Sequence, residues 1–96
     1  MILTVEETKV HLRVEHDEED AYIAGLIAQA QAIAEDYTRV SYDDEEPPPE
    51  PVRLACLLMV SYLYENRDVP DNASYNAMRR AFNNLLYPHR SPELMF

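Results

Sequence analysis

Glycine, cysteine and basic residues are all scarce in this chain of 96 residues. The one glycine, Gly25, leaves almost no residue suited to a positive backbone φ angle, which disfavours hairpin-rich β folds and glycine-rich phosphate loops. The one cysteine, Cys56, cannot form an intrachain disulfide. Its place in the apolar run 54–60 predicts a small buried side chain rather than a nucleophile.

Basic residues number 8 against 18 acidic ones, which leaves a formal net charge of -10. This imbalance opposes non-specific attraction to nucleic-acid phosphates and to anionic lipid. The excess of acidic residues lies in the first half of the chain: residues 1–50 hold 14 acids and 3 bases, whereas residues 51–96 hold 4 acids and 5 bases. The division indicates two surfaces with different roles or a head-to-tail contact between copies; a more solvated helix face in the first half is the alternative.

The length limits the chain to a single domain over residues 1–96, and a hydrophobic share of 47% argues against disorder. The N-terminus has no basic region followed by an apolar stretch, as a secretory signal would. The longest apolar run, residues 54–64, has 11 residues, whereas a membrane span needs about 20. We therefore expect a protein made in the cytosol that has no contact with a membrane.

Two helices are predicted in the first half from their start signals and apolar spacing. Thr4 and Glu7 form a capping box for a short helix over residues 5–12. Asp17 is the expected cap of a long helix over residues 18–38, with acidic residues in its first turn. The apolar residues of this long helix follow the 3, 4, 7 spacing of one buried face.

The second half begins after a loop over residues 39–50, where three consecutive prolines predict an extended, solvated segment. Residues 52–65 are apolar almost all round, which is typical of a helix central to its domain or sandwiched at a subunit contact. Ser74 is the expected cap of a last helix, and a tail is expected over residues 88–96. The inward-facing residues predicted for the last helix are Tyr75, Met78, Phe82, Leu85 and Leu86.

No strand pattern of useful length and no internal repeat is present. The predicted fold class is therefore all-α. We expect a compact bundle of about four helices with a long second helix, a central apolar third helix, an acidic proline-rich loop and an extended C-terminal tail.

Catalytic, cofactor-binding and metal-binding residues are not predicted. The acids at 17–20 are consecutive and fan around a helix, so they cannot all converge in one pocket. His11 and His16 are five residues apart, unlike the i, i+4 pair of a helical zinc site. Residues 43–46 lack the alternating ligands and the turn glycine of a calcium loop. We expect no enzymatic activity, no metal and no cofactor.

Three features are candidates for contact with a partner. Gly25 lies within the long helix beside several alanines; it marks either a surface for close backbone approach or an ordinary position that tolerates glycine. Arg67 ends the central helix, where it is expected to cap free carbonyls, with an inter-subunit ion pair as the alternative. The apolar end 94–96 is either a frayed terminus or a docking peptide.

In the order and residues of these segments, the sequence resembles the small head–tail connector proteins of tailed phages. These are also called adaptor or DNA-packaging proteins. The resemblance covers nearly the whole chain, and its strongest parts are His11-Leu12-Arg13 with the acidic stretch after it, and Tyr64-Glu65-Asn66-Arg67. Two features depart from the family pattern: the acidic loop with its three consecutive prolines is unusually rich in proline, and Arg39 stands where a glycine usually lies near Thr38. The other segments that carry the resemblance are Leu3–Val14, Leu26–Ala30, Pro51–Ala55 and Leu85–Arg90.

The resemblance implies a helical virion subunit, made in the bacterial host and placed at the head–tail junction. It would assemble with copies of itself into a ring, expected to be dodecameric, between the portal protein and a head-closure or tail-completion protein. DNA would pass through the ring without specific binding. The tail from Pro88 to Phe96 would dock on the portal.

By the same analogy, the central helix and its end at Glu65, Asn66 and Arg67 would support ring contacts. Carboxylates that line a channel would repel DNA phosphates, so that a genome can slide past without sticking. The expected channel-facing acids are Asp43, Asp44, Glu45 and Glu46. The expected interface residues are Gly25, Tyr64, Glu65, Asn66, Arg67, Arg79, Arg80, Arg90, Leu94, Met95 and Phe96.

The charge has a second interpretation, an acidic helical regulatory module that binds a basic partner, for example as a DNA mimic. A mimic requires a regularly spaced, continuous acidic face. The acids of this sequence instead gather at one helix start and in one loop. Arg79-Arg80, the one adjacent basic pair, is expected to lie on a solvated helix face rather than to bind nucleic acid.

Overall fold

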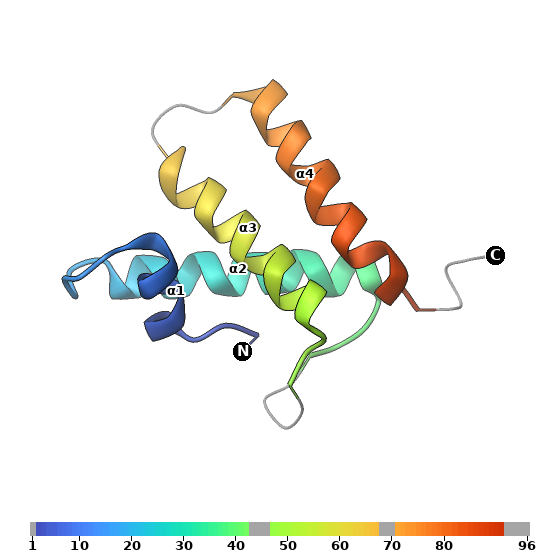
Figure 1. The fold of residues 1–96 in the computed structure, drawn as a ribbon, viewed down its shortest axis with the longest axis horizontal. Helices are drawn as coiled ribbons and strands as arrows, with labels where there is room; N and C mark the ends of the chain where they lie inside the picture. The colour runs from blue at the N-terminus through green and yellow to red at the C-terminus, as the bar shows by residue number, and fades with distance from the viewer. Residues whose placement is uncertain (1, 43–46, 68–70, 92–96) are drawn as a thin grey trace.

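The computed structural model describes residues 2–42, 47–67 and 71–91, and Figure 1 shows how the helices in these ranges are arranged. No strand occurs in them, which confirms the predicted all-α fold. None of the helices in this part of the chain is both long and apolar enough to cross a membrane. The elements are α1 (Val5–Leu12), α2 (Asp20–Thr38), α3 (Glu50–Glu65), α4 (Asn72–Leu86) and a short 3₁₀ turn, η1 (Tyr87–His89).

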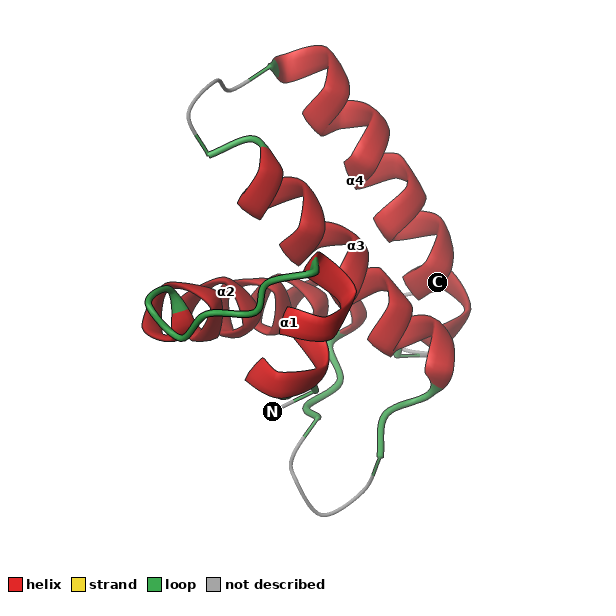
Figure 2. Ribbon diagram, turned by 60° about the vertical axis from the view of Figure 1, so that its left-hand side comes forward, coloured by secondary structure: helices red, strands yellow, loops and turns green. Residues whose placement is uncertain are grey.

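The helices form a flat body of 45 × 35 × 17 Å. In both Figure 1 and Figure 2, α3 and α4 lie side by side in antiparallel directions, and both contact α2, which crosses them. The short helix α1 lies over the N-terminal part of α2 and also contacts α3. Both α2 and α3 contact each of the other three helices, so α3 has the central place that its apolar pattern predicts and shares it with α2.

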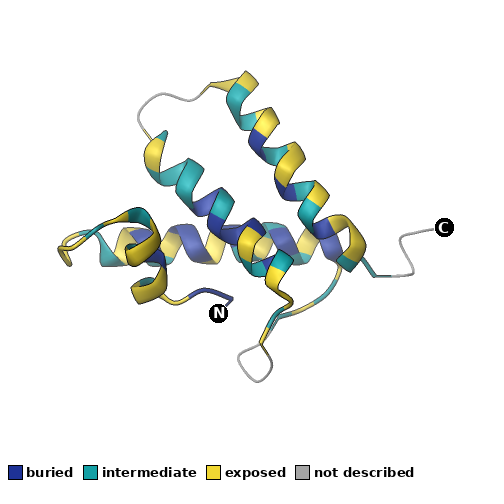
Figure 3. Cartoon of the chain, in the orientation of Figure 1, coloured by how far each residue is buried: buried dark blue, intermediate teal, exposed yellow. Residues whose placement is uncertain are grey.

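The core lies where α2 and α3 cross, and these two helices carry most of the buried residues, coloured dark blue in Figure 3. Val52, Ala55, Met59 and Val60 of α3 have no exposed surface. Full burial of one such large apolar side chain stabilises the fold by about 1.5–3 kcal/mol. The pattern has an exception at Leu54, which is 43% exposed. The other core residues with no more than 1% exposure are Leu3, Ile23, Ile27, Ala30, Ala34, Cys56, Phe82 and Leu86.

Cys56 lies within this core, as predicted. Burial raises the pKa of its thiol to about 12, because an apolar environment disfavours the charged thiolate. A thiol that stays protonated at neutral pH is a poor nucleophile. The residue therefore acts as a small apolar side chain.

The helix starts agree in part with their predicted caps. Thr4 Oγ1 accepts a hydrogen bond of 3.1 Å from the amide of Glu7, and α1 begins at Val5 as expected. The predicted start of α2 at Glu18 is wrong by two residues, and Asp17 is not its cap, because its carboxylate contacts Lys9 instead.

The expected cap of α4 is also wrong. Asp71, rather than Ser74, occupies the N-cap position, and its Oδ1 accepts a 3.1 Å hydrogen bond from the amide of Ala73. Ser74 lies in the first turn, and its hydroxyl is 2.7 Å from the Tyr62 hydroxyl of α3. The prediction failed because two possible caps lie three residues apart, and the contact with α3 decides between them.

The chain leaves α2 through a left-handed residue, Arg39, whose φ is 59°. This is the conformation that glycine adopts without cost, and a side chain there costs about 1–2 kcal/mol. The predicted tail begins two residues later than expected, at Arg90, because Pro88 lies inside η1, where its missing amide hydrogen is not needed. The amide of Ser91 then donates a 2.8 Å hydrogen bond to the carbonyl of Thr38, which holds the end of the described chain against α2.

Candidate functional site

The connection between α1 and α2, residues 13–19, carries four of the acidic residues and is called the acidic turn below. Arg13 has a left-handed φ of 61° and ends α1. The amide of Arg13 donates to the carbonyl of Val10, and the amide of Val14 donates to that of Lys9. This C-terminal cap reverses the chain and directs the acidic turn away from the core.

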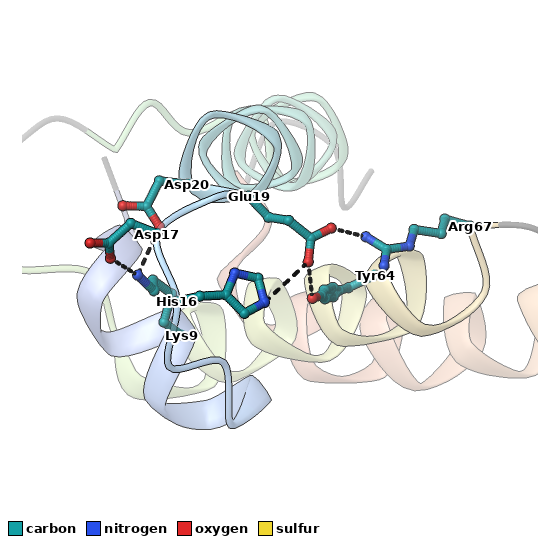
Figure 4. Close-up of polar contacts among 7 residues, drawn as sticks. All are labelled: Lys9, His16, Asp17, Glu19, Asp20, Tyr64 and Arg67. Carbon is teal, nitrogen blue, oxygen red and sulfur yellow. Dashed lines mark hydrogen bonds and ion pairs between the residues drawn. The ribbon is translucent and has the colours of Figure 1, made fainter.

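A lysine of α1 holds the second half of the acidic turn. The Lys9 ammonium lies 2.6 Å from Asp17 Oδ1 and 2.8 Å from Asp20 Oδ1, as Figure 4 shows. The hydrogen bond to Asp17 and then that to Asp20 raise the pKa of Lys9, and the same contact lowers the pKa of Asp17. We call this contact the Lys9 bridge; it fixes the acidic turn against α1.

A second contact, the Glu19 cluster, joins the acidic turn to the end of α3. Glu19 Oε1 accepts a 2.6 Å hydrogen bond from the Tyr64 hydroxyl, and Oε2 accepts one from the Arg67 guanidinium (Figure 4). His16 Nε2 lies 4.0 Å from the same carboxylate. The hydrogen bond from Tyr64, followed by that from Arg67, lowers the pKa of Glu19, because both favour its charged form.

Aromatic rings complete the Glu19 cluster. The Arg67 guanidinium lies 4.6 Å from the ring centre of Tyr64 and 5.6 Å from that of Tyr22 on α2. A cation over an aromatic face is stabilised by about 0.5–1 kcal/mol at an exposed site. The cluster thus joins three segments, and it brings together the two parts of the sequence that carry the strongest family resemblance.

The neighbours of Arg67 have separate roles. Asn66 is the C-cap of α3, and both its amide nitrogen and its side-chain nitrogen donate to the carbonyl of Tyr62, at 3.0 and 2.9 Å. Asn66 therefore provides the cap that was predicted for Arg67. Glu65 is exposed at the last position of the helix. Within one subunit, Arg67 is paired with Glu19, and contact of this segment with another subunit stays a prediction.

The remaining arginines expected at an interface lie around the second half. Arg79 donates to Asn83 and lies 5.4 Å from the ring centre of Phe82. Arg80 is exposed on α4, outside the buried stripe, as expected. Arg90 lies over the ring of Tyr37, 5.0 Å from its centre, at the C-terminal end of α2. Contact of these three arginines with another subunit stays a prediction.

Gly25 is exposed on α2, and a Cβ atom built there would have no neighbour within 4 Å. Among the described residues no other backbone approaches it closely, so the expected close contact would have to be made with a partner. Two other groups of predicted residues lie outside the described residues: the channel-facing acids Asp43, Asp44, Glu45 and Glu46, and the apolar end Leu94, Met95 and Phe96.

A groove of about 270 Å³ lies between the open ends of α3 and α4. Its carboxylate, Asp71, caps α4, and its two tyrosines pack edge to face with ring centres 6.0 Å apart. Within residues 2–42, 47–67 and 71–91, no group of three metal-ligating side chains occurs. The groove is lined by Tyr62, Leu63, Asn66, Asp71, Asn72 and Tyr75.

Fold and charge thus define a small acidic helical protein whose polar contacts fix a surface turn. The family model for phage gp6-like head-tail connector proteins matches residues 2–90 of the chain. The chain therefore belongs to this family, and the resemblance inferred from the sequence is confirmed. No curated protein and no solved structure matches it. Membership assigns the chain a structural connector role in a phage particle.

Proposed function

We propose that this protein is a ring-forming subunit at the head–tail junction of the virion. The ring joins the portal to a head-closure or tail-completion protein, and the genome passes through it during packaging and ejection. The observation that carries the proposal is the family match over residues 2–90. The same match supports a role without catalysis.

The separation of charge supports association between identical subunits. Residues 20–38 of α2 contain acids and no basic residue, whereas residues 72–86 of α4 contain two arginines and no acid. A closed ring requires that two different surfaces of one subunit complement each other. Surfaces of opposite charge on one chain are consistent with such head-to-tail contacts.

The direct test is co-assembly of the full chain with the portal protein of the same phage. We expect electron microscopy to show an additional ring on one end of the portal, and a stable complex to co-sediment. The portal alone is the control. Absence of binding would overturn the proposed function.

The channel surface is the finer part of the proposal, and it concerns Asp43, Asp44, Glu45 and Glu46. Their replacement by the corresponding amides would reduce the net charge from -10 to -6. We expect the variant to bind DNA more tightly at low salt and virions that carry it to eject DNA more slowly. Normal packaging and ejection, with no gain in DNA affinity, would remove these residues from the channel.

An acidic DNA mimic is less well supported. Several carboxylates are already neutralised within the subunit: Arg53 lies 3.4 Å from Glu7 and 2.9 Å from Glu50, while Lys9 and Arg67 hold the acids of the turn. A mimic needs unpaired acids at regular spacing along one face. These ion pairs interrupt such a face.

A further inference from the structure

The acidic turn presents a fixed group of carboxylates at one end of the molecule. Five carboxylates from Glu15 to Asp20 gather there against three cations, Lys9, Arg13 and Arg67. Glu15 and Glu18 are exposed, and neither forms an ion pair with another described residue. The turn therefore keeps a negative charge after its internal pairs are formed.

The Lys9 bridge and the Glu19 cluster hold the acidic turn from both sides. Lys9 binds it to α1, and Tyr64 with Arg67 binds it to α3. A surface loop that is already ordered loses little conformational entropy when it binds a partner. The two contacts therefore give the acidic turn the properties of a preorganised docking element.

The outward face of α4 has the complementary chemistry. Asn76, Arg80 and Asn84 recur every fourth residue, so they lie one above the other on a single exposed face. Tyr87, 52% exposed, follows in η1 at the end of this face. Among the described residues Arg80 forms no ion pair, and guanidinium and amide groups are suitable donors to carboxylates.

These two surfaces lie on different sides of the subunit. Figure 1 places the acidic turn at the left-hand end of the long axis and α4 with η1 toward the right-hand end. None of the ion pairs or side-chain hydrogen bonds found among the described residues joins the acidic turn to α4. Two complementary surfaces on opposite sides are what a head-to-tail contact requires.

We propose that the acidic turn of one copy docks on the outward face of α4 of the next copy, with Glu15 and Glu18 facing Arg80. This inference rests on the proposed ring, and it names the surfaces that meet in it. It also gives Tyr64 and Arg67 a positioning role, because they hold the turn in its docking conformation without crossing the interface.

Two charge-reversed chains test the contact by complementation. One carries Arg80→Glu, and the other carries Glu15→Arg with Glu18→Arg. Each variant alone places like charges in the contact, whereas a mixture restores opposite charges at every junction. Sedimentation equilibrium at millimolar concentration should show association of the wild type, association about tenfold weaker or more for each variant alone, and recovery in the mixture.

Matched controls separate this contact from a general effect of charge. Arg39→Glu makes the same charge change on an exposed residue of the first half, and Glu6→Arg with Asp36→Arg does so for two exposed acids. Both controls should associate as the wild type does. Circular dichroism confirms that each chain is folded, and the neutral Glu15→Gln with Glu18→Gln replaces the reversed pair if that pair unfolds.

The proposal is overturned if the mixture associates no better than its components, if Arg80→Glu associates as the wild type does, or if the wild type stays monomeric. Portal binding is measured on the same preparations. Portal binding together with any of these results would refute the α4 contact and leave the proposed function standing. Self-association with recovery in the mixture, but without portal binding, would do the reverse.

Discussion

The acidic turn is held in place by other interactions than the packed pair of helices α3 and α4. We call this pair, with its buried side chains, the apolar layer. The turn depends on ion pairs between partly exposed groups, such as the Lys9 bridge, whereas the layer depends on buried residues such as Phe82 and Leu86, which have no exposed surface. Exposed ion pairs contribute little to global stability and weaken with salt, while apolar burial contributes most of it. The comparison separates residues that keep the protein folded from residues that shape its surface.

The apolar layer should show the largest effect on stability. Phe82→Ala removes a fully buried ring from the contact of α4 with the core, and we expect a loss of about 3–5 kcal/mol in the free energy of unfolding. Urea denaturation followed by circular dichroism measures it. The control Tyr87→Ala, on a half-exposed ring, should stay within about 0.5 kcal/mol of the wild type. Equal losses in both variants would contradict the proposed division.

The polar end of the same layer should show an intermediate effect. Asp71→Ala removes the hydrogen bond that caps α4, and we expect a loss of about 1 kcal/mol, measured by the same denaturation. Asp71→Asn keeps an acceptor oxygen and should retain most of the stability. A neutral Asp71→Ala would show that Ser74 or another residue acts as the cap.

Gly25 tests the outer surface of α2. Because a Cβ atom would meet nothing within 4 Å, Gly25→Ala should raise the stability of the subunit by about 0.5–1 kcal/mol. Thermal unfolding measures the gain, and Ala28→Gly, one turn further along the exposed face, should give a loss of similar size. A gain in stability with unchanged ring assembly would remove Gly25 from the interface, whereas impaired assembly would place it there.

The smallest change in global stability is expected in the acidic turn, and it should depend on pH. The pKa of Glu19 is lower in the folded protein than its ordinary value of 4.5, so its carboxylate stabilises the fold above that pH. This contribution is lost as the pH falls through the lowered value. Glu19→Gln should therefore be less stable than the wild type at pH 7 and approach it in acid.

Urea denaturation at pH 7 and in the acid range, at low and high salt, measures this difference. High salt should reduce it, because ion pairs between partly exposed groups are screened. Glu18→Gln, on an exposed neighbour, is the matched control and should follow the wild type. A difference between wild type and Glu19→Gln that stays constant with pH would show that the carboxylate is not the stabilising group.

Local signals in the sequence predicted much of the fold. The capping box at Thr4 gave the start of α1, and the apolar pattern of residues 52–65 identified the central helix, because capping and periodicity act within a few residues. The starts of α2 and α4 were missed because contacts with other helices engage the expected cap residues. Asp17 is engaged by Lys9, and Asp71 takes the position expected for Ser74.

The candidate site was predictable only in its parts. The acidic stretch and the Tyr64–Arg67 segment were each recognised, but the pairing of Glu19 with Arg67 joins residues 48 positions apart. No periodicity or cap links such distant residues. The family resemblance was the one feature of the sequence that linked the two segments, because both of them carry it.

The sequence by itself determined the all-α class, the central helix and the buried cysteine through composition and short-range spacing, and it indicated the connector family through the resemblance of its segments. The tertiary structure decided which acids are neutralised and which stay exposed. Lys9 and Arg67 each select particular carboxylates through distance, and distance depends on how α1, α2 and α3 pack. A charge count gives the total of -10, but only folding decides where that charge faces a partner.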